Sequence, residues 1–333
     1  MLISGVKSAI SFELNRNPRI ASRPANFRKY IPEPYDGVVI ISADFELAWA
    51  WRYAKGLGEP LADSIKYARK ARANIPQILA YCEQYAIPIT WATVGHLFLD
   101  HCQKDQQGHA HPEIDRLEHF ENKWWRFSRG DWFDCDPCSS FEENDAWYAP
   151  DLIQKIKASA VNHEIGCHTF SHIDCSEQIC PPQTLRSELQ ACSAAAEQEG
   201  ISLKSFVFPG HTMGNFKTIR QMGYDSVRTN YINVLGYPSL DEDGLWRHEA
   251  TMEINFNPAW PMWYNLYRYR SLLKKTVKNN VVCHLWFHPS LEPKGMEVME
   301  SVLASLAGYR NKLWMTTMGN YTHWLNTGER TDG

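Results

Sequence analysis

Short apolar runs alternate with stretches of helical hydrophobic spacing along most of the chain. The apolar runs predict buried strands, and apolar positions that recur every three or four residues predict helices. We expect strands at 38–44, 87–93, 164–167, 204–208, 225–227, 281–287 and 313–315, and helices at 64–85, 150–159, 183–199, 215–222, 293–307 and 318–326. Pro76 is expected to kink or restart the first helix. Alternating strands and helices predict an α/β fold with a mainly parallel sheet, open or closed into a barrel.

Two long stretches interrupt this alternation. Residues 101–149 contain four His, three Cys and four Trp without regular spacing, and residues 229–270 are also rich in Trp and Tyr. Loops of this length inside a compact domain are usually lids or binding loops. We therefore expect an N-terminal arm over 1–35, a single domain over 36–327 with two aromatic-rich loop insertions at about 101–149 and 229–270, and a tail over 328–333.

Carboxylates follow the first predicted strand. Asp44 and Glu46 are two positions apart, so in an extended chain they share a face, with Phe45 on the other. Two carboxylates held so close are stabilised when a cation lies between them or when one of them is protonated. The alternative is a pair of solvated carboxylates at a strand end.

Histidines follow two further predicted strands. His168 and His172 are four positions apart, so they would lie on one face of a helical turn, and His288 ends the strand at 281–287. Each feature alone is often structural. Active sites of parallel α/β folds, however, form where the carboxyl ends of the strands meet. One carboxylate with two histidines is a hydrolytic zinc set that leaves a position open for water.

Several segments of the chain resemble the polysaccharide deacetylase family, the NodB-homology domain that is similar to carbohydrate esterase family 4. The stretch His163-Glu164-Ile165-Gly166-Cys167-His168-Thr169-Phe170-Ser171-His172 is close to the family's second motif. Shorter matches lie at Asn74-Ile75-Pro76, 87–96, Phe208-Pro209-Gly210, Leu285-Trp286-Phe287-His288-Pro289 and 314–319. The resemblance covers roughly residues 36–327. It implies a distorted (β/α) barrel that hydrolyses N- or O-acyl groups with a divalent metal ion.

The resemblance also implies roles for the polar residues at the strand ends. The family's first motif usually has adjacent aspartates, whereas a branch that includes peptidoglycan-deacetylase-like enzymes spaces its acids as in Asp44-Phe45-Glu46. By this likeness Asp44 is the general base, and Glu46, His168 and His172 bind one divalent ion, for which Zn²⁺ is the first choice. The roles of Asp44 and Glu46 could be exchanged. His288 would donate a proton to the departing amine.

One expected residue is missing. The family's third motif usually supplies an arginine that orients the base, but Val207 stands at that position. Arg228 or Arg247 could take its place from a different loop.

The composition adds a substrate class. The chain has 13 Trp, 15 Tyr, 14 Phe and 13 His, more polar-tipped aromatic side chains than a core requires, and this surplus indicates an aromatic-lined groove. Indole faces at a catalytic mouth suit the apolar faces of sugar rings. The residues expected to contact the substrate are Trp49, Trp51, Pro209, Gly210 and Trp286. The net charge of −4 gives no reason to expect nucleic acid as a partner.

The first insertion contains a second candidate metal motif. Cys135 and Cys138 have the two-residue spacing of a zinc half-site or a redox pair. A structural zinc would need further ligands, for which the candidates are His101, Cys102, His109 and His111. Since the chain has no second Cys-x-x-Cys, ordinary loop cysteines are favoured.

The remaining features concern the compartment and the reaction. The chain has no apolar run long enough to span a membrane, no signal-peptide pattern, and nine scattered cysteines, so a cytoplasmic location is expected. The expected activity is metal-dependent removal of an acetyl group from an N-acetylated sugar of a polysaccharide, lipid-linked glycan or sugar nucleotide. The alternatives are a hydrolase of a non-sugar amide and a catalytically degenerate barrel that binds carbohydrate. The oligomeric state is not predicted.

Overall fold

The computed structural model describes residues 7, 10, 18–229 and 234–331. The positions outside it belong to the predicted N-terminal arm (1–6, 8–9 and 11–17), the second predicted insertion (230–233) and the predicted tail (332–333). Among the described residues, no helix is long and apolar enough to cross a membrane.

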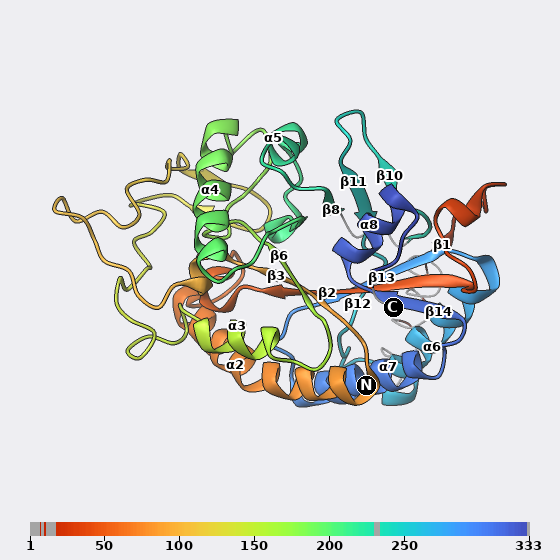
Figure 1. Ribbon diagram of the computed structural model, residues 1–333. Coiled ribbons are helices and arrows are strands. Elements are labelled where there is room, and N and C mark those ends of the chain that lie inside the picture. The colour runs from red at the N-terminus through yellow and green to blue at the C-terminus, as the bar shows by residue number, and fades with distance from the viewer. Residues whose placement is uncertain (1–6, 8–9, 11–17, 230–233, 332–333) are drawn as a thin grey trace.

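A curled, mainly parallel sheet forms the centre of the molecule (Figure 1). Its strands are β2 (Gly37–Phe45), β3 (Thr90–Thr93), β6 (Glu164–Cys167), β7 (Ser205–Val207), β8 (Ser226–Thr229), β10 (Ser239–Leu240), β11 (Trp246–Glu249), β12 (Met252–Glu253), β13 (Val282–Phe287) and β14 (Leu313–Thr316). The order is β10-β11-β8-β7-β6-β3-β2-β13-β12, with β14 also paired to β2. Among the described strands of this sheet, only β10 and β11 pair in antiparallel fashion. A separate parallel pair joins β1 (Arg19–Ile20) to β9 (Val234–Leu235).

Strand β2 distorts the barrel. It pairs with β13 over residues 38–43, whereas β14 pairs with residues 37–40 and β3 with residues 42–45. Because a strand has two edges and β13 occupies one of them, β14 and β3 share the other edge in succession. The described strands therefore follow an open, curled path, which is the distorted (β/α) barrel expected from the sequence.

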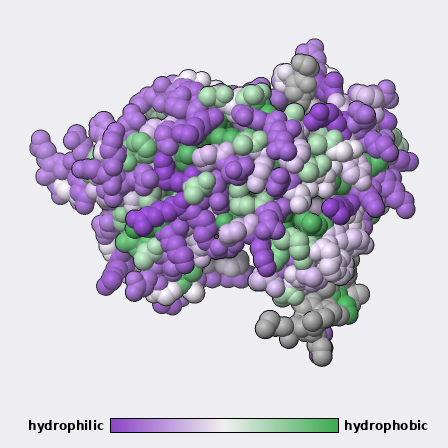
Figure 2. Space-filling model, turned by 90° about the horizontal axis from the view of Figure 1, so that it is seen from below, coloured by the Kyte–Doolittle hydropathy of each residue, from purple (hydrophilic) through white to green (hydrophobic). Residues whose placement is uncertain are grey.

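Helices cover the sheet. They are α2 (Pro60–Tyr85), α3 (Pro150–Lys157), α4 (Pro182–Gln198), α5 (Phe216–Gln221), α6 (Met262–Asn279), α7 (Pro293–Ala307) and α8 (Met318–Thr327). Helices α2, α3, α6 and α7 lie below the sheet in the view of Figure 1. Figure 2 shows that this lower face is largely hydrophilic, with small apolar areas between the polar ones. The helices thus turn their apolar sides inward, as the helical spacing in the sequence predicts.

The predicted strands and helices all form, with small differences at their ends. Helix α2 continues through Pro76 and does not restart there. Ile75, Ile78 and Leu79 are buried on either side of the proline. Burying three such side chains contributes several kcal/mol, which outweighs the hydrogen bond that Pro76 cannot donate.

The two aromatic-rich stretches differ in structure. The regular structure of residues 101–149 is limited to one short antiparallel pair, β4 (Phe120–Glu121) and β5 (Arg126–Phe127). Helix α3 begins directly after this segment. This segment, drawn in yellow, projects at the left of Figure 1. The stretch 229–270, by contrast, also supplies β11, β12 and the first turns of α6. The alternation of buried and outward residues over 246–249 is the signal by which β11 could have been found.

Candidate active site

Glu46, His168 and His172 converge at the carboxyl ends of β2 and β6. The Oε2 atom of Glu46 lies 3.3 Å from Nε2 of His168 and 3.1 Å from Nε2 of His172. All three side chains are buried, and their ligand atoms lie within 4.8 Å of one another. One carboxylate oxygen and two imidazole nitrogens at this spacing match the donor set and size of a divalent metal site, since such bonds are about 2.0–2.2 Å long.

The two imidazoles are prepared to act as ligands. Nδ1 of His168 lies 2.8 Å from the carbonyl oxygen of Val207, so this nitrogen carries the proton and Nε2 faces Glu46 with its lone pair. Burial lowers the pKa of His172 to about 4, despite the opposing effect of Glu46, so its ring is neutral near pH 7. A neutral imidazole is the form that binds a metal ion.

The histidine pair does not lie on a helical turn, so that part of the sequence prediction is wrong. Residues 168–172 form a loop in which Thr169 and His172 adopt left-handed backbone conformations (φ 59° and 58°). Glu188 of α4 accepts hydrogen bonds from the backbone N–H groups of Phe170 (2.9 Å) and Ser171 (2.8 Å). This buried carboxylate binds N–H groups in the loop interior and so holds the turn that brings the two histidines together.

Asp44 lies beside this set and is held by Arg228 of β8. The guanidinium donates two parallel hydrogen bonds, from Nη1 to Oδ1 at 2.6 Å and from Nη2 to Oδ2 at 2.7 Å. Burial alone would raise the pKa of Asp44, but the charge and hydrogen bonds of Arg228 hold it at about 2. Of the two arginines named from the sequence, Arg228 is therefore the one that contacts Asp44. The other candidate, Arg247, instead pairs with Asp241 at 3.0 Å.

His288 faces both carboxylates from the end of β13. Its Nε2 lies 3.5 Å from Oε1 of Glu46 and 3.9 Å from Oδ2 of Asp44, and its Nδ1 lies 3.6 Å from Oε1 of Glu253. Burial opposes protonation of the ring, but the carboxylates of Glu46, Glu253 and Asp44 raise the pKa of His288 to about 9. Glu253 lies in the two-residue strand β12, which is too short to be distinguished by its sequence pattern from the surrounding loop.

The structure separates the residues that were expected to contact a substrate. Trp49 was expected to contact the substrate, but its side chain has no exposed surface. The centroid of its ring lies 4.4 Å from that of His96, and its Nε1 donates a hydrogen bond to the carbonyl of Trp147. It belongs to the core because the short 3₁₀ helix η2 (Leu47–Trp49) turns it inward. Trp51 is half-buried and lines a narrow hollow together with His288 and the two carboxylates.

Trp286 and Pro209, which were also expected to contact a substrate, are both buried. Trp286 is buried, with its ring 5.4 Å from that of His288 and the guanidinium of Arg228 5.1 Å from its centroid. The ring of His211 also packs edge-on against Trp286, with 4.9 Å between the ring centroids. Pro209 is buried at the start of the turn that follows β7. These residues pack around the site's polar groups.

Trp125 reaches the site from the first insertion, where the sequence offered it only as one of several loop tryptophans that could line a substrate groove. Its ring meets that of His172 edge-on at 5.5 Å. It also covers Gly210, which has a left-handed backbone (φ 54°), so closely that a Cβ atom at 210 would lie 2.6 Å from the indole. Only glycine fits there, because any side chain would strike the ring. The matched pair Gly210–Trp125 fixes one wall of the site.

Comparisons with known proteins point to one family. Residues 63–227 match the family model described as polysaccharide deacetylase. No curated protein matches the chain. Among solved structures, proteins assigned as polysaccharide deacetylases from Mycobacterium smegmatis and Pseudomonas aeruginosa PAO1 are similar, at 14% and 12% identity and TM-scores of 0.60 and 0.61. The matches cover 94% and 90% of this chain and 96% and 94% of the others.

An allantoinase is similar to the same degree. The crystal structure of Puue allantoinase is 12% identical, with a TM-score of 0.61, and the match covers 90% of this chain and 93% of that one. At such low identity these likenesses show the fold alone. All three confirm the barrel type expected from the sequence.

Proposed function

This chain belongs to the polysaccharide deacetylase family, and we propose on that premise that it is a metal-dependent hydrolase. Its proposed reaction is the removal of an acetyl group from the nitrogen of an N-acetylated sugar. The observation that carries the proposal is the convergence of Glu46, His168 and His172 beside an Asp44 that Arg228 holds in place. Acyl hydrolysis at a metal site needs these two parts, a ligand set and a separate base.

Glu46, His168 and His172 would hold the ion. A divalent ion such as Zn²⁺ in that position would activate water and polarise the acyl carbonyl. The three residues supply one oxygen and two nitrogen donors and leave a further position for water, which is the ligand count of catalytic rather than structural zinc.

Asp44 and His288 are proposed to transfer the protons of the reaction. Asp44 is ionised and fixed by two hydrogen bonds, so it can accept a proton from the attacking water at a carboxylate oxygen. His288 is protonated near neutral pH and lies across from both carboxylates, so its Nε2 can donate a proton to the departing nitrogen. Glu253 contacts the other ring nitrogen, which orients the imidazole and favours its charged form. Trp51, Trp286, Pro209 and Gly210 are proposed to shape the substrate site around these groups.

The proposed substrate is a polysaccharide, a lipid-linked glycan or a sugar nucleotide. All nine cysteines are free, including the neighbouring Cys167 and Cys192, whose sulfur atoms lie 3.5 Å apart. Free thiols at such a distance favour a reducing compartment such as the cytoplasm, where unfinished or activated glycans are more accessible than mature wall polymer.

The alternative functions differ in their support. A non-sugar amide remains the second candidate, because the fold is as similar to an allantoinase as to the proteins assigned as deacetylases. The degenerate carbohydrate-binding barrel had one argument in its favour, the missing third-motif arginine. Arg228 supplies two hydrogen bonds to Asp44 and so removes that argument.

A screen for loss of acetyl mass tests the proposal. The purified protein is incubated with N-acetylated oligosaccharides, UDP-N-acetylglucosamine and allantoin, after removal of metal by a chelator and again after return of Zn²⁺. We expect loss of acetyl mass from a sugar substrate, only in the metal-loaded sample. Turnover of the ureide alone would favour the second candidate, whereas sugar binding without turnover in the loaded protein would contradict an enzyme.

Replacement of Arg228 by lysine tests the positioning of Asp44. Lysine keeps the positive charge but cannot donate two parallel hydrogen bonds to a carboxylate. We expect kcat to fall by about 10- to 100-fold, the usual cost of losing an orienting contact, with little change in KM and in bound metal. Arg247→Lys is the matched control, since Arg247 pairs with Asp241 away from the site and should retain kcat. Equal losses in both variants would contradict the assignment.

Replacement of Glu253 by glutamine tests the proton donor through the pH profile. His288 loses its proton as the pH rises through its pKa of about 9, so kcat should decline on the alkaline side of the profile. A bound cation offsets part of the effect of Glu46, so the decline should fall at or below about pH 9. Removing the negative charge 3.6 Å from Nδ1 disfavours the imidazolium, so the alkaline limb should move down by about one pH unit. Glu253→Asp keeps the negative charge, so its alkaline limb should lie between those of the wild type and Glu253→Gln. An unmoved limb would exclude this role for Glu253.

A further inference from the structure

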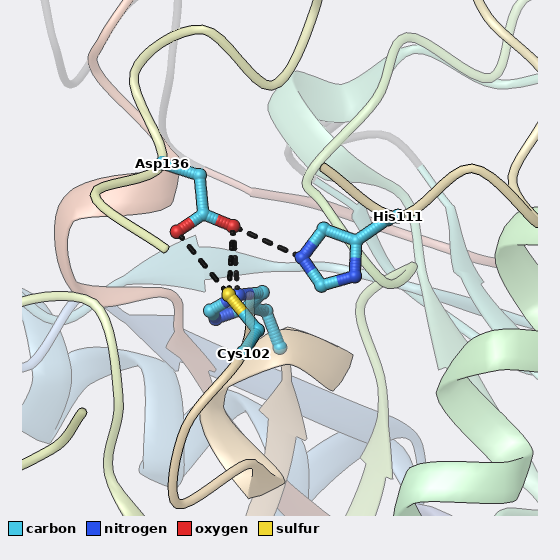
Figure 3. Close-up of side chains that lie close together, drawn as sticks. Cys102, His111 and Asp136 are labelled. Carbon is cyan, nitrogen blue, oxygen red and sulfur yellow. Dashed lines mark hydrogen bonds and ion pairs between the residues drawn. The ribbon is translucent and has the colours of Figure 1, made fainter. Parts of the chain in front are cut away.

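A second group of metal-binding side chains lies where the first insertion meets the barrel. We call His96, Cys102, His111 and Asp136 the loop cluster; Figure 3 shows Cys102 and His111 directed at the carboxylate of Asp136. One oxygen of Asp136, Oδ2, lies 3.0 Å from Nε2 of His96, 3.0 Å from Nε2 of His111 and 3.5 Å from Sγ of Cys102. The four ligand atoms all lie within 4.8 Å of one another.

These spacings resemble those around a tetrahedral zinc ion. Bonds of about 2.0 Å to nitrogen and oxygen and about 2.3 Å to sulfur, at tetrahedral angles, place neighbouring donors roughly 3.3–3.7 Å apart. The observed separations of 3.0–3.5 Å from Asp136 are close to these values. Two imidazoles, a thiol and a carboxylate are all zinc ligands, and a mixed set of nitrogen, sulfur and oxygen suits this borderline-soft ion.

His96 gives independent support for a ligand. Its side chain has no exposed surface, and its Nε2 has no hydrogen-bond partner, although Oδ2 of Asp136 is only 3.0 Å away. The ring's other nitrogen, Nδ1, lies 3.1 Å from the carbonyl of Trp147 and therefore carries the proton. Nε2 thus points into the cluster, at the same carboxylate oxygen that His111 and Cys102 face, as a metal ligand would.

The outer contacts of the cluster hold its ligands in position. The backbone N–H of Cys138 donates to Oδ1 of Asp136 at 2.9 Å, which leaves Oδ2 for the centre of the cluster. The hydroxyl of Tyr148 lies 3.1 Å from the sulfur of Cys102. Such second contacts to each ligand are typical of metal sites.

We propose that His96, Cys102, His111 and Asp136 bind a structural Zn²⁺ ion that joins the first insertion to the barrel. Four protein ligands close the coordination shell, as in structural rather than catalytic zinc sites. His96 belongs to the 3₁₀ helix η3 (Gly95–Phe98) directly after β3, whereas the other three ligands come from the insertion. The ion therefore cross-links two parts of the chain.

The insertion contains little regular structure that a cross-link could reinforce. Beyond the two-residue strands β4 and β5, its described residues lack a sheet or helix that would fix their course. A metal bound by residues 102, 111 and 136 would order the segment on either side of Trp125, whose ring forms one wall of the candidate active site. Metal binding would add to the folding free energy that the buried side chains of this loop supply.

The cluster clarifies the cysteine motif of the insertion. Cys102 and His111 were among the candidate ligands, and the third residue from the insertion is Asp136, which lies between Cys135 and Cys138. Cys135 points elsewhere, with its sulfur 3.8 Å from the hydroxyl of Tyr53. The two-residue spacing of the cysteines is thus not itself the zinc motif. His101 and His109, the other candidates, are exposed.

Cobalt substitution distinguishes this ion from the one at the candidate active site. The set Glu46, His168 and His172 has no sulfur, so a thiolate-to-cobalt charge-transfer band in the near ultraviolet can come only from a cysteine ligand. Full-length protein is stripped with a chelator, reloaded with Co²⁺ and examined by absorption spectroscopy, and zinc in the untreated protein is counted by plasma mass spectrometry. We expect the band in the wild type and two zinc ions per chain.

Variants assign the band to the loop cluster. Cys102→Ser should abolish the band and lose one zinc, Cys135→Ser should retain both, and His168→Ala with His172→Ala should lose one zinc and keep the band. Chelation should also lower the melting temperature of the double histidine variant, because its remaining ion is structural. A wild-type protein without the band, or a band that survives in Cys102→Ser, would overturn the proposal, and neither result depends on whether the chain deacetylates sugars.

Discussion

Replacement of His168 by alanine should remove the metal from the candidate active site and reduce kcat/KM by at least about 10³-fold. The cation's stabilisation of transition-state charge is worth several kcal/mol, and each 1.4 kcal/mol corresponds to roughly a tenfold change in rate. His168 is fully buried and its Nε2 faces Glu46, so no water-exposed residue can replace it as a ligand. Metal content by plasma mass spectrometry and acetate release on one preparation provide the measurement.

The control for this variant is a nearby histidine that does not face Glu46. His211 packs its ring on Trp286 at 4.9 Å and is half-buried, so His211→Ala should retain the full metal content. A His168→Ala protein with undiminished metal and turnover would contradict the ligand assignment. Loss of metal in both variants would indicate general unfolding, which circular dichroism would reveal.

Replacement of Asp44 by asparagine should lower kcat by about 10²- to 10⁴-fold, the usual contribution of a general base, while the metal content stays unchanged. Asparagine has nearly the same shape, but its amide cannot accept the proton from water. The expected retention of metal follows from the geometry, since the oxygen shared by His168 and His172 belongs to Glu46. Metal content and kcat are measured together.

Glu46→Gln is the matched partner of this experiment. It should lose activity and the ion of the candidate active site, because a neutral amide is a weak ligand for a divalent cation. The opposite pattern, with metal lost from Asp44→Asn and kept in Glu46→Gln, would exchange the roles of the two acids. The pair of variants therefore resolves the alternative that the sequence left open.

The main strands and helices followed from local patterns of hydrophobicity, because the faces they bury repeat along the sequence. The polar groups at the strand ends could be placed together for the same reason, since parallel strands bring their carboxyl ends to one edge. Asp44, His168 and His288 were found in this way. The likeness of residues 163–172 to a family motif then added their expected roles.

The residues that were missed depend on pairings between distant parts of the chain. Arg228 could be named only as one of two candidates, because its contact with Asp44 joins residues 184 positions apart. Trp125 reaches Gly210 from an irregular loop whose path no periodic pattern encodes. Trp49 was misplaced for a related reason: sequence proximity to Asp44 does not show which way a side chain turns after the strand ends.

The contact between Arg228 and Asp44 has a mechanical consequence as well. In the sheet, β8 and β2 are separated by β7, β6 and β3, so the ion pair does not follow the hydrogen-bonded path but crosses the hollow of the curled sheet. Nη1 of Arg228 also donates to Ser42, which in turn lies 2.8 Å from Nε2 of His284. These contacts link opposite sides of a barrel whose described strands do not close. The ion pair that orients the proposed base would therefore also limit how far the two sides of the sheet can move apart.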